Sequence, residues 1–72
     1  MTREYLVIYE HGDNNWSAYS PDVPGCIATG PTKEETARLF AEALEMHLEG
    51  LREDGLPIPE AITLFDRVKI AV

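Results

Sequence analysis

The sequence predicts an α+β domain in which one long helix packs on a mostly antiparallel four-stranded sheet, with elements in the order β-β-β-α-β. Three observations lead to this prediction. Short runs of β-branched and aromatic residues alternate with turn formers in the first half of the chain, a long amphipathic segment follows, and an alternating apolar stretch comes last. With 72 residues, the chain has room for a single domain covering residues 1–72.

The first half of the chain contains three short strand candidates. β-branched and aromatic side chains predict a strand over residues 3–10, and turn formers at 11–15 separate it from a second strand over 16–20. These two strands should form an antiparallel hairpin. Two prolines and a glycine at 21–25 then interrupt the sheet before a short third strand over 26–29.

The segment after the third strand carries the start and stop signals of a helix. Thr32 is a suitable N-cap, and Glu35, three residues later, completes a capping box. Gly55 supplies a C-terminal cap, and Pro57 and Pro59 prevent continuation. One side of the helix is apolar and comprises Thr36, Ala37, Phe40, Ala43, Leu44, His47, Leu48 and Leu51. We expect a helix of about 20 residues, about 30 Å long, that covers one sheet face.

The end of the sequence predicts a fourth strand. Val68, Ile70 and Val72 alternate with Lys69 and Ala71, which is the pattern of a strand with one apolar face. A helix-length crossover lets this strand lie parallel to the first, with a right-handed connection. The expected spatial order of the strands is 3-2-1-4.

The charge of the chain excludes one class of partner. The net charge is -7, with 13 acidic and 6 basic residues, and the basic residues are scattered. Proteins that bind nucleic acid need basic patches for the phosphates, so we expect no direct nucleic-acid binding, including to duplex DNA. An acidic surface suits a basic protein partner. The alternative is that the acidity only keeps a small protein soluble.

Targeting and redox signals are also missing from the sequence. No apolar run approaches the length of about 18 residues that a membrane span needs, and the first residues do not resemble a signal peptide. A single cysteine, Cys26, cannot form an internal disulfide. We therefore expect a cytoplasmic protein without a membrane partner.

The reactive side chains of the chain predict no catalytic centre. A metal-dependent nuclease needs several carboxylates on one patch. The candidates are Glu10, Asp13, Asp22, Glu34, Glu35 and Asp66, and turns or the helix start account for most of them. Cys26 is interpreted as a small apolar filler, and His47 as a half-buried neutral imidazole with one hydrogen-bond partner. His11 belongs to the predicted turn and should be solvated. We expect no enzyme activity, no metal and no cofactor.

Several motifs together resemble the HicB antitoxin family. Residues 16–30 read WSAYSPDVPGCIATG and are followed by TKEE at 32–35, while HLEGLREDG at 47–55 and LPIPE at 56–60 resemble the end of that family's helix. Thr36 and Ala61 depart from the pattern, because the family usually has Ala at the first position and often Pro at the second. The resemblance covers nearly the whole chain.

This resemblance implies a partly degraded ribonuclease-H-like fold that binds and inhibits a HicA-type toxin, a small protein that cleaves messenger RNA. Many members also carry a C-terminal DNA-binding segment. The sequence stops at Val72 without one, so we expect no DNA-dependent autoregulation. Two alternatives stay open: a structural or regulatory domain without a toxin partner, and a residual nuclease. A neighbouring gene for a short basic protein would favour the antitoxin.

The sequence also predicts contact surfaces. Trp16 and Tyr19 should point to opposite faces of the second strand, so that one packs under the helix and the other contacts a partner. The predicted partner-binding residues are Trp16, Tyr19, Asp22, Glu34, Glu42, Glu45 and Glu49. A chain this small has a thin core, so we also expect a homo-oligomer. The predicted self-association residues are Leu39, Met46, Val68 and Ile70.

Overall fold

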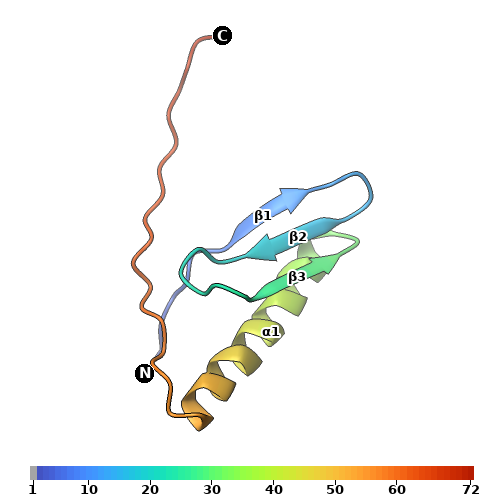
Figure 1. Ribbon diagram of the computed structural model, residues 1–72. Helices are drawn as coiled ribbons and strands as arrows, with labels where there is room; N and C mark the ends of the chain where they lie inside the picture. The colour runs from blue at the N-terminus through green and yellow to red at the C-terminus, as the bar shows by residue number, and fades with distance from the viewer. Residues whose placement is uncertain (1) are drawn as a thin grey trace.

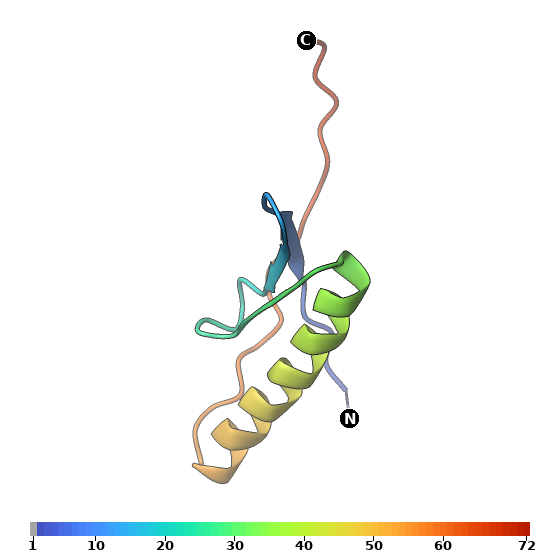
Figure 2. The ribbon, with the colours of Figure 1, turned by 90° about the vertical axis from the view of Figure 1, so that its right-hand side faces the viewer.

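The computed structural model describes residues 2–72 and contains three strands and one helix in the order β-β-β-α (Figure 1). The elements are β1 (Ile8–His11), β2 (Trp16–Tyr19), β3 (Ile27–Gly30) and α1 (Lys33–Glu53). The strands form one antiparallel sheet in the order β1-β2-β3, and α1 lies on one side of it (Figure 2). No helix within residues 2–72 is long and apolar enough to cross a membrane.

The register of the sheet divides its side chains between two faces. Because side chains alternate along a strand, each row of paired residues points to one side. The row that faces α1 consists of Tyr9, Ala18 and Ala28. The adjacent row faces away from α1 and consists of Ile8, Tyr19 and Ile27. The sheet therefore has one covered face and one open face.

The core lies between the covered face and α1. Its buried hydrophobic residues are Ala18 on β2, Val23 and Cys26 in the loop before β3, and Phe40 on α1. Partly buried side chains packed around them are Tyr5, Val7, Tyr9, Ala28, Ala43, Leu44 and Leu48. The predicted apolar side of the helix is thus confirmed at its centre, and the burial of Cys26 agrees with its interpretation as a filler.

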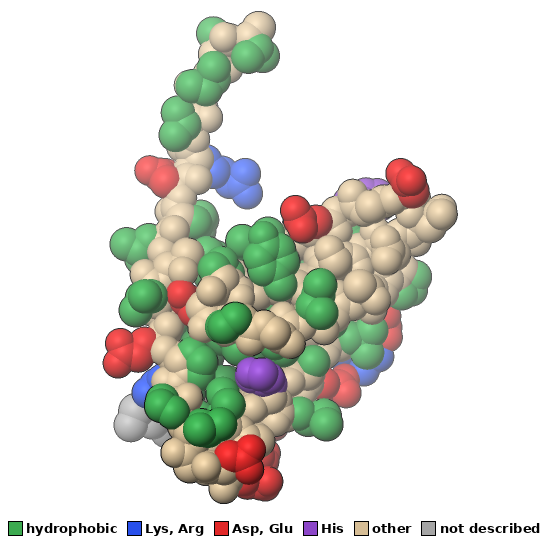
Figure 3. Space-filling view, viewed as in Figure 1, with side chains coloured by type: hydrophobic (Ala, Val, Ile, Leu, Met, Phe, Trp, Pro, Cys, Tyr) green, Lys and Arg blue, Asp and Glu red, His purple; other side chains and the backbone are tan. Residues whose placement is uncertain are grey.

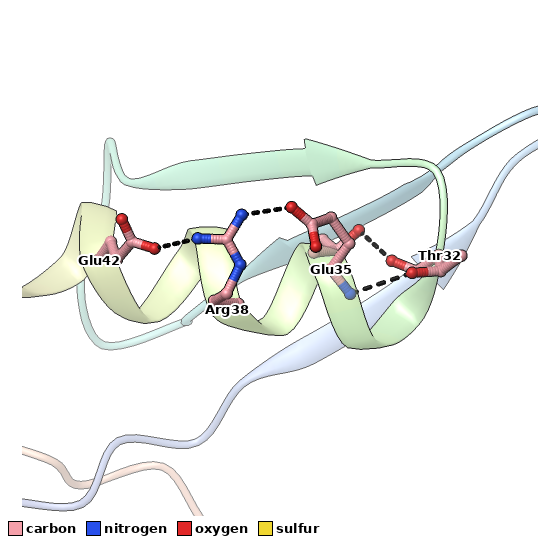
Figure 4. Close-up of polar contacts among 5 residues, drawn as sticks. Thr32, Glu35, Arg38 and Glu42 are labelled. Atoms are coloured by element: carbon pink, nitrogen blue, oxygen red, sulfur yellow. Dashed lines mark hydrogen bonds and ion pairs between the residues drawn. The ribbon is translucent and has the colours of Figure 1, made fainter.

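Both ends of α1 are capped by the predicted residues. The Thr32 hydroxyl accepts a hydrogen bond from the Glu35 N–H at 3.0 Å (Figure 4). At the other end, the Leu56 N–H donates to the Leu51 carbonyl at 2.9 Å, and Gly55 adopts a φ of 70°. This is a Schellman motif, which needs a left-handed residue after the last turn. The predicted N-cap Thr32 and the predicted C-terminal cap Gly55 are confirmed.

The end of β3 lies very close to the first turn of α1. A Cβ atom added to Gly30 would lie 2.7 Å from the Thr36 hydroxyl oxygen. That hydroxyl is buried and donates to the Thr32 carbonyl oxygen at 2.7 Å. Glycine at position 30 therefore lets the strand and the helix approach each other.

The prediction of a four-stranded sheet in the order β-β-β-α-β is wrong. Within residues 2–72 the sheet has three strands, and the segment with Val68, Ile70 and Val72 pairs with none of them. The spatial order 3-2-1 is correct, but the parallel fourth strand beside β1 is not formed. Alternation showed that this segment has one apolar side, and it carried no information on whether a strand edge lies within reach.

The first strand is shorter than predicted for a related reason. The strand begins at Ile8, whereas the sequence predicted a start at residue 3. β2 ends at Tyr19 opposite Ile8, so the residues before Ile8 have no ladder partner on that side. The predicted second and third strands are confirmed to within one residue at each end.

Long-range hydrogen bonds hold the chain that follows α1 against the start of the chain. The Arg3 guanidinium donates to the carbonyl oxygens of Ile58 and Pro59, at 3.2 Å and 2.9 Å, and the Tyr5 hydroxyl donates to Pro59 at 2.5 Å. Further on, the carboxylate of Asp22 binds Thr63. Leu64 and Phe65 still lie beside the residues before β1, and the end of the chain then leaves the body of the molecule (Figure 1). These bonds explain the path that replaces the predicted fourth strand.

Candidate protein-binding site

Four glutamates lie along the exposed side of α1. Glu42, Glu45, Glu49 and Glu53 follow one another at spacings of three or four residues, which places them on one side of a helix, and all four are exposed. We name these four residues the glutamate stripe. Like charges four residues apart on a helix cost about 0.2–0.5 kcal/mol per pair. A stripe of this kind weakens the isolated helix and suits contact with positive charge.

One arginine neutralises only the beginning of the stripe. Arg38 forms ion pairs with Glu35 and with Glu42, both on the surface of α1 (Figure 4). Hydrogen bonding and the positive charge of Arg38 hold the pKa of Glu35 below its ordinary value. In the described part of the chain, these are the two ion pairs, so Glu45 and Glu49 form none, although Arg52 lines the same depression. The Glu35 side chain contacts Arg38 and does not accept a hydrogen bond from the Thr32 N–H, so the predicted capping box is not completed.

The open face of the sheet presents an apolar row. Ile8, Tyr19 and Ile27 lie side by side across the three strands, and Ile27 is 63% exposed. The next row on this face is polar and consists of Glu10, Ser17 and Thr29. A small apolar area with a polar border is typical of a protein contact surface. This surface and the glutamate stripe lie on opposite sides of the molecule.

Trp16 and Tyr19 point to opposite faces, as predicted. Trp16 is on the covered side, where its ring stacks on His11 with centroids 4.3 Å apart and planes inclined by 6°. His11 is exposed and is the last residue of β1, so its predicted place in the turn is wrong by one position. Beside the pair, the Lys33 ammonium lies 4.9 Å above the Tyr9 ring. Tyr19 is left as the aromatic residue of the open face.

Asp22 lies in the loop after β2 and binds a distant segment of the chain. One carboxylate oxygen accepts from the Ile62 N–H at 3.2 Å and from the Thr63 N–H at 3.0 Å, and the other accepts from the Thr63 hydroxyl at 2.6 Å. These bonds, above all the one from the Thr63 hydroxyl, lower the pKa of Asp22. The carboxylate predicted to contact a partner thus binds the protein's own chain.

The remaining predicted contact residues are distributed over separate surfaces. Glu34 is exposed at the start of α1, and Met46 is exposed to 75% on the helix, where Leu39 is half-buried. Val68 and Ile70 are exposed to 77% and 70% in the segment that leaves the body. The structure therefore brings Glu42, Glu45 and Glu49 together on one surface and separates them from Trp16, Tyr19 and Asp22.

The reactive residues do not form a catalytic arrangement. Within residues 2–72, no group of three or more His, Cys, Asp and Glu side chains lies close enough to hold a metal ion. Burial raises the pKa of the Cys26 thiol, which disfavours the nucleophilic thiolate. His47 is half-buried on α1. The six carboxylates considered above are spread over the hairpin, the loop after β2, the helix start and the last segment.

Sequence reasoning missed the residues that hold the last segment in place. Arg3 and Tyr5 bind Pro59, and Asp22 binds Thr63 across 41 positions of sequence. No local pattern marks such pairs, because each partner has an ordinary neighbourhood. An alternation of apolar residues is visible in a sequence, whereas a hydrogen bond between two distant loops is not.

Comparison with known proteins connects these features to one family. The model of the HicB-like antitoxin of bacterial toxin–antitoxin systems matches residues 5–70. An Antitoxin HicB 2 of Photorhabdus laumondii is 32% identical over 82% of this chain and 42% of its own length. A UPF0150 protein of Synechocystis is 30% identical over 94% of this chain and 87% of its own length.

A third relative comes from a bacteriophage. A 14.9 kDa protein of Haemophilus phage HP1 is 33% identical over 79% of this chain and 43% of its own length. The chain thus spans less than half the length of the phage protein and of the Photorhabdus antitoxin. No solved structure matches this chain.

Proposed function

We propose that this chain, which belongs to the HicB-like antitoxin family of bacterial toxin–antitoxin systems, binds and neutralises a small basic toxin of the HicA type. The observation that carries the proposal is the match of the antitoxin family model to residues 5–70. The role is one of binding, and no step of it needs a catalytic residue of this chain. The partner itself is inferred from the family and from charge.

The glutamate stripe is the surface we assign to the toxin. A protein that cleaves messenger RNA has to bind phosphates, and it does so largely with Lys and Arg side chains. A row of carboxylates presents negative charges to the same side chains, so it competes with RNA for them. Complementary charge also speeds the encounter of the two proteins. The chain as a whole supports this, since its net charge is -7.

Within the stripe, Glu45 and Glu49 are the strongest candidates. Glu42 is already paired with Arg38, whereas Glu45 and Glu49 have no such neutralisation in the described residues. Their side chains flank Leu48 and Arg52 in a shallow depression of about 290 Å³ on the outside of α1. A basic side chain of the toxin can therefore meet two carboxylates at one place without first breaking an ion pair.

A pair of charge reversals tests this assignment. The double variant Glu45→Lys with Glu49→Lys should weaken binding to the toxin about tenfold or more, as measured by titration calorimetry at two salt concentrations. The toxin in this experiment is the short basic protein encoded beside this chain, or a relative's HicA-type toxin where no such gene is present.

A matched control separates the stripe from overall charge. Glu10→Lys with Asp13→Lys on the first hairpin makes the same change of net charge, from -7 to -3. This variant should bind with nearly the affinity of the unchanged chain. Equal losses of affinity in the two variants would show that net charge alone causes the effect. Unchanged affinity in the stripe variant would show that the toxin binds another surface, and the apolar row with Tyr19 would be tested next.

A further inference from the structure

The outer edge of β1 is a free strand edge. β2 occupies one side of β1, and no strand within residues 2–72 occupies the other. At the hairpin, the Gly12 N–H donates to the Asn15 carbonyl at 2.8 Å. Because hydrogen-bonded pairs alternate with non-bonded pairs in an antiparallel ladder, this bond puts Tyr9 in a non-bonded pair, with its N–H and C=O directed away from β2. Backbone groups at such an edge are a template for another extended segment.

An open groove of about 670 Å³ lies beside this edge, and we name it the edge groove. One wall includes residues 6–9, and the other belongs to segment 63–67. Leu64 and Phe65 of the second wall line the groove, yet they are exposed to 92% and 74%. The groove is therefore space that segment 63–67 leaves open between itself and the edge of β1.

The walls of the edge groove are rich in apolar and aromatic side chains. Tyr9, Trp16 and Phe65 contribute rings, and Val7 and Leu64 contribute aliphatic side chains. Figure 3 shows hydrophobic side chains along the last segment, from the body of the molecule outward. In peptide binding by strand addition, the main chain of the edge supplies affinity, and the surface beside it selects alternate side chains of the added segment. The edge groove offers both parts.

Among the described residues, the two charged side chains that line the edge groove are both basic. They are Arg67 and Lys33, whose ammonium lies 4.9 Å from the centre of the Tyr9 ring. Neither forms an ion pair within residues 2–72. The groove is thus a positive site on a chain with net charge -7. Carboxylates complement it, whereas a basic toxin brings like charge, which disfavours contact.

We infer that the edge groove binds an extended acidic segment of a partner protein other than the toxin. The segment pairs through its main chain with the outer edge of β1. Because side chains alternate along an extended segment, apolar residues on one side pack against the rings of the groove, while Asp or Glu residues on the other side reach Lys33 and Arg67. The groove shares no residue with the glutamate stripe, so the inference is independent of toxin binding.

Three short peptides test the chemistry of the occupant. The chain's single tryptophan, Trp16, lines the groove, so its fluorescence reports binding to the whole protein. The acetylated and amidated peptide EVEVEV should change this fluorescence in a saturable way. KVKVKV, which reverses the charge, and EEEVVV, which keeps the composition but loses the alternation, should each bind about tenfold more weakly or less. No saturable binding of EVEVEV, or equal affinity for any two of the peptides, would overturn the inference.

A pair of charge reversals locates the site. Lys33→Glu with Arg67→Glu should weaken the binding of EVEVEV about tenfold or more. The control is Arg52→Glu with Lys69→Glu, which makes the same change of net charge with residues that do not line the groove. It should keep the affinity within about twofold of the unchanged chain. Retained amide shifts of α1 show that each variant stays folded, and equal losses in the two variants would contradict the assignment.

Amide exchange tests the pairing with β1 directly. In the presence of saturating EVEVEV, the Tyr9 N–H should exchange more slowly, because the added segment supplies an acceptor at the outer edge. The Ser17 N–H on β2, which is not at this edge, is the internal control and should exchange at an unchanged rate. A Tyr9 amide that exchanges at the same rate with and without the bound peptide would overturn strand addition, as would displacement of the peptide by a HicA-type toxin.

Discussion

Ser20 and Asp22 flank Pro21 just after β2, and their side-chain oxygen atoms differ in hydrogen bonding. The Ser20 hydroxyl is buried and has no hydrogen-bond partner among residues 2–72. The Asp22 carboxylate accepts three hydrogen bonds from Ile62 and Thr63. A buried hydroxyl without a partner costs free energy, whereas a carboxylate with several donors is stabilised in its charged form. Each residue therefore gives a separate prediction.

Removing the Ser20 hydroxyl should stabilise the protein. Ser20→Ala keeps the small side chain and eliminates the unsatisfied oxygen, so the free energy of unfolding should rise by up to about 1 kcal/mol. Urea denaturation measures the change, with Ser17→Ala on the open face as the control, which should stay within about 0.5 kcal/mol of the unchanged chain. A loss of stability in Ser20→Ala would show that the hydroxyl has a partner in solution.

The Asp22 contact should weaken in acid. Its hydrogen bonds lower the pKa of Asp22 below the ordinary value of 3.8, so the folded state binds a proton less readily than the unfolded state. The contact therefore contributes fully above about pH 4 and is lost as the pH falls through the lowered pKa.

Amide exchange measures this contact residue by residue. Protection of the Ile62 and Thr63 amides should fall below pH 4. Asp22→Asn should lower the protection and abolish its fall below pH 4, because the neutral amide keeps one acceptor oxygen for the two N–H groups but does not titrate. Protection that is unchanged in Asp22→Asn would contradict the role of this carboxylate.

At the scale of elements, the sequence predicted what is fixed by neighbours and missed what is fixed by distant contacts. The helix is correct at both ends because Thr32 and Gly55 act within a few residues of the turns they cap. The second and third strands are correct to within one residue because turn formers separate them, whereas the first strand begins five residues later than predicted. The prediction of a fourth strand failed because the path of the chain after Pro59 depends on its contact with Asp22, which lies 41 positions before Thr63.

In the candidate site, too, features fixed by neighbouring residues were predicted and features fixed by distant contacts were missed. The glutamate stripe was foreseen because its spacing on a helix is visible in the sequence. The use of Asp22 inside the chain, and the pairing of Glu42 with Arg38, depend on which rotamers and distant donors are present. Local patterns therefore indicate which surface is acidic, and three-dimensional contacts decide which of its charges remain available.

The contact between β3 and α1 gives a prediction at this scale. Gly30→Ala should destabilise the protein by about 1–3 kcal/mol, because the new methyl group would lie 2.7 Å from the Thr36 hydroxyl oxygen. Adding Thr36→Ala should recover part of the loss, since it removes that oxygen. Thermal denaturation of the two single variants and the double variant gives the coupling energy. Strict additivity would show that the clash is with the backbone of α1.

At the scale of the whole molecule, a small core contrasts with the large exposed apolar surface of residues 62–72. Four buried hydrophobic residues form the centre of the core, while six exposed ones lie at positions 62–72. A partner that covers this surface would bury apolar area and raise stability by mass action. The glutamate stripe lies on the exposed side of α1.

Neutralisation of the toxin tests the central claim most directly. The measurement is the rate at which a purified HicA-type toxin cleaves a fluorescent messenger-RNA fragment as this chain is added. The unchanged chain and the Glu10→Lys, Asp13→Lys variant should stop cleavage at a near-equimolar ratio, while the Glu45→Lys, Glu49→Lys variant should need a clear excess. Cleavage that continues undiminished in an excess of the unchanged chain would contradict the antitoxin function.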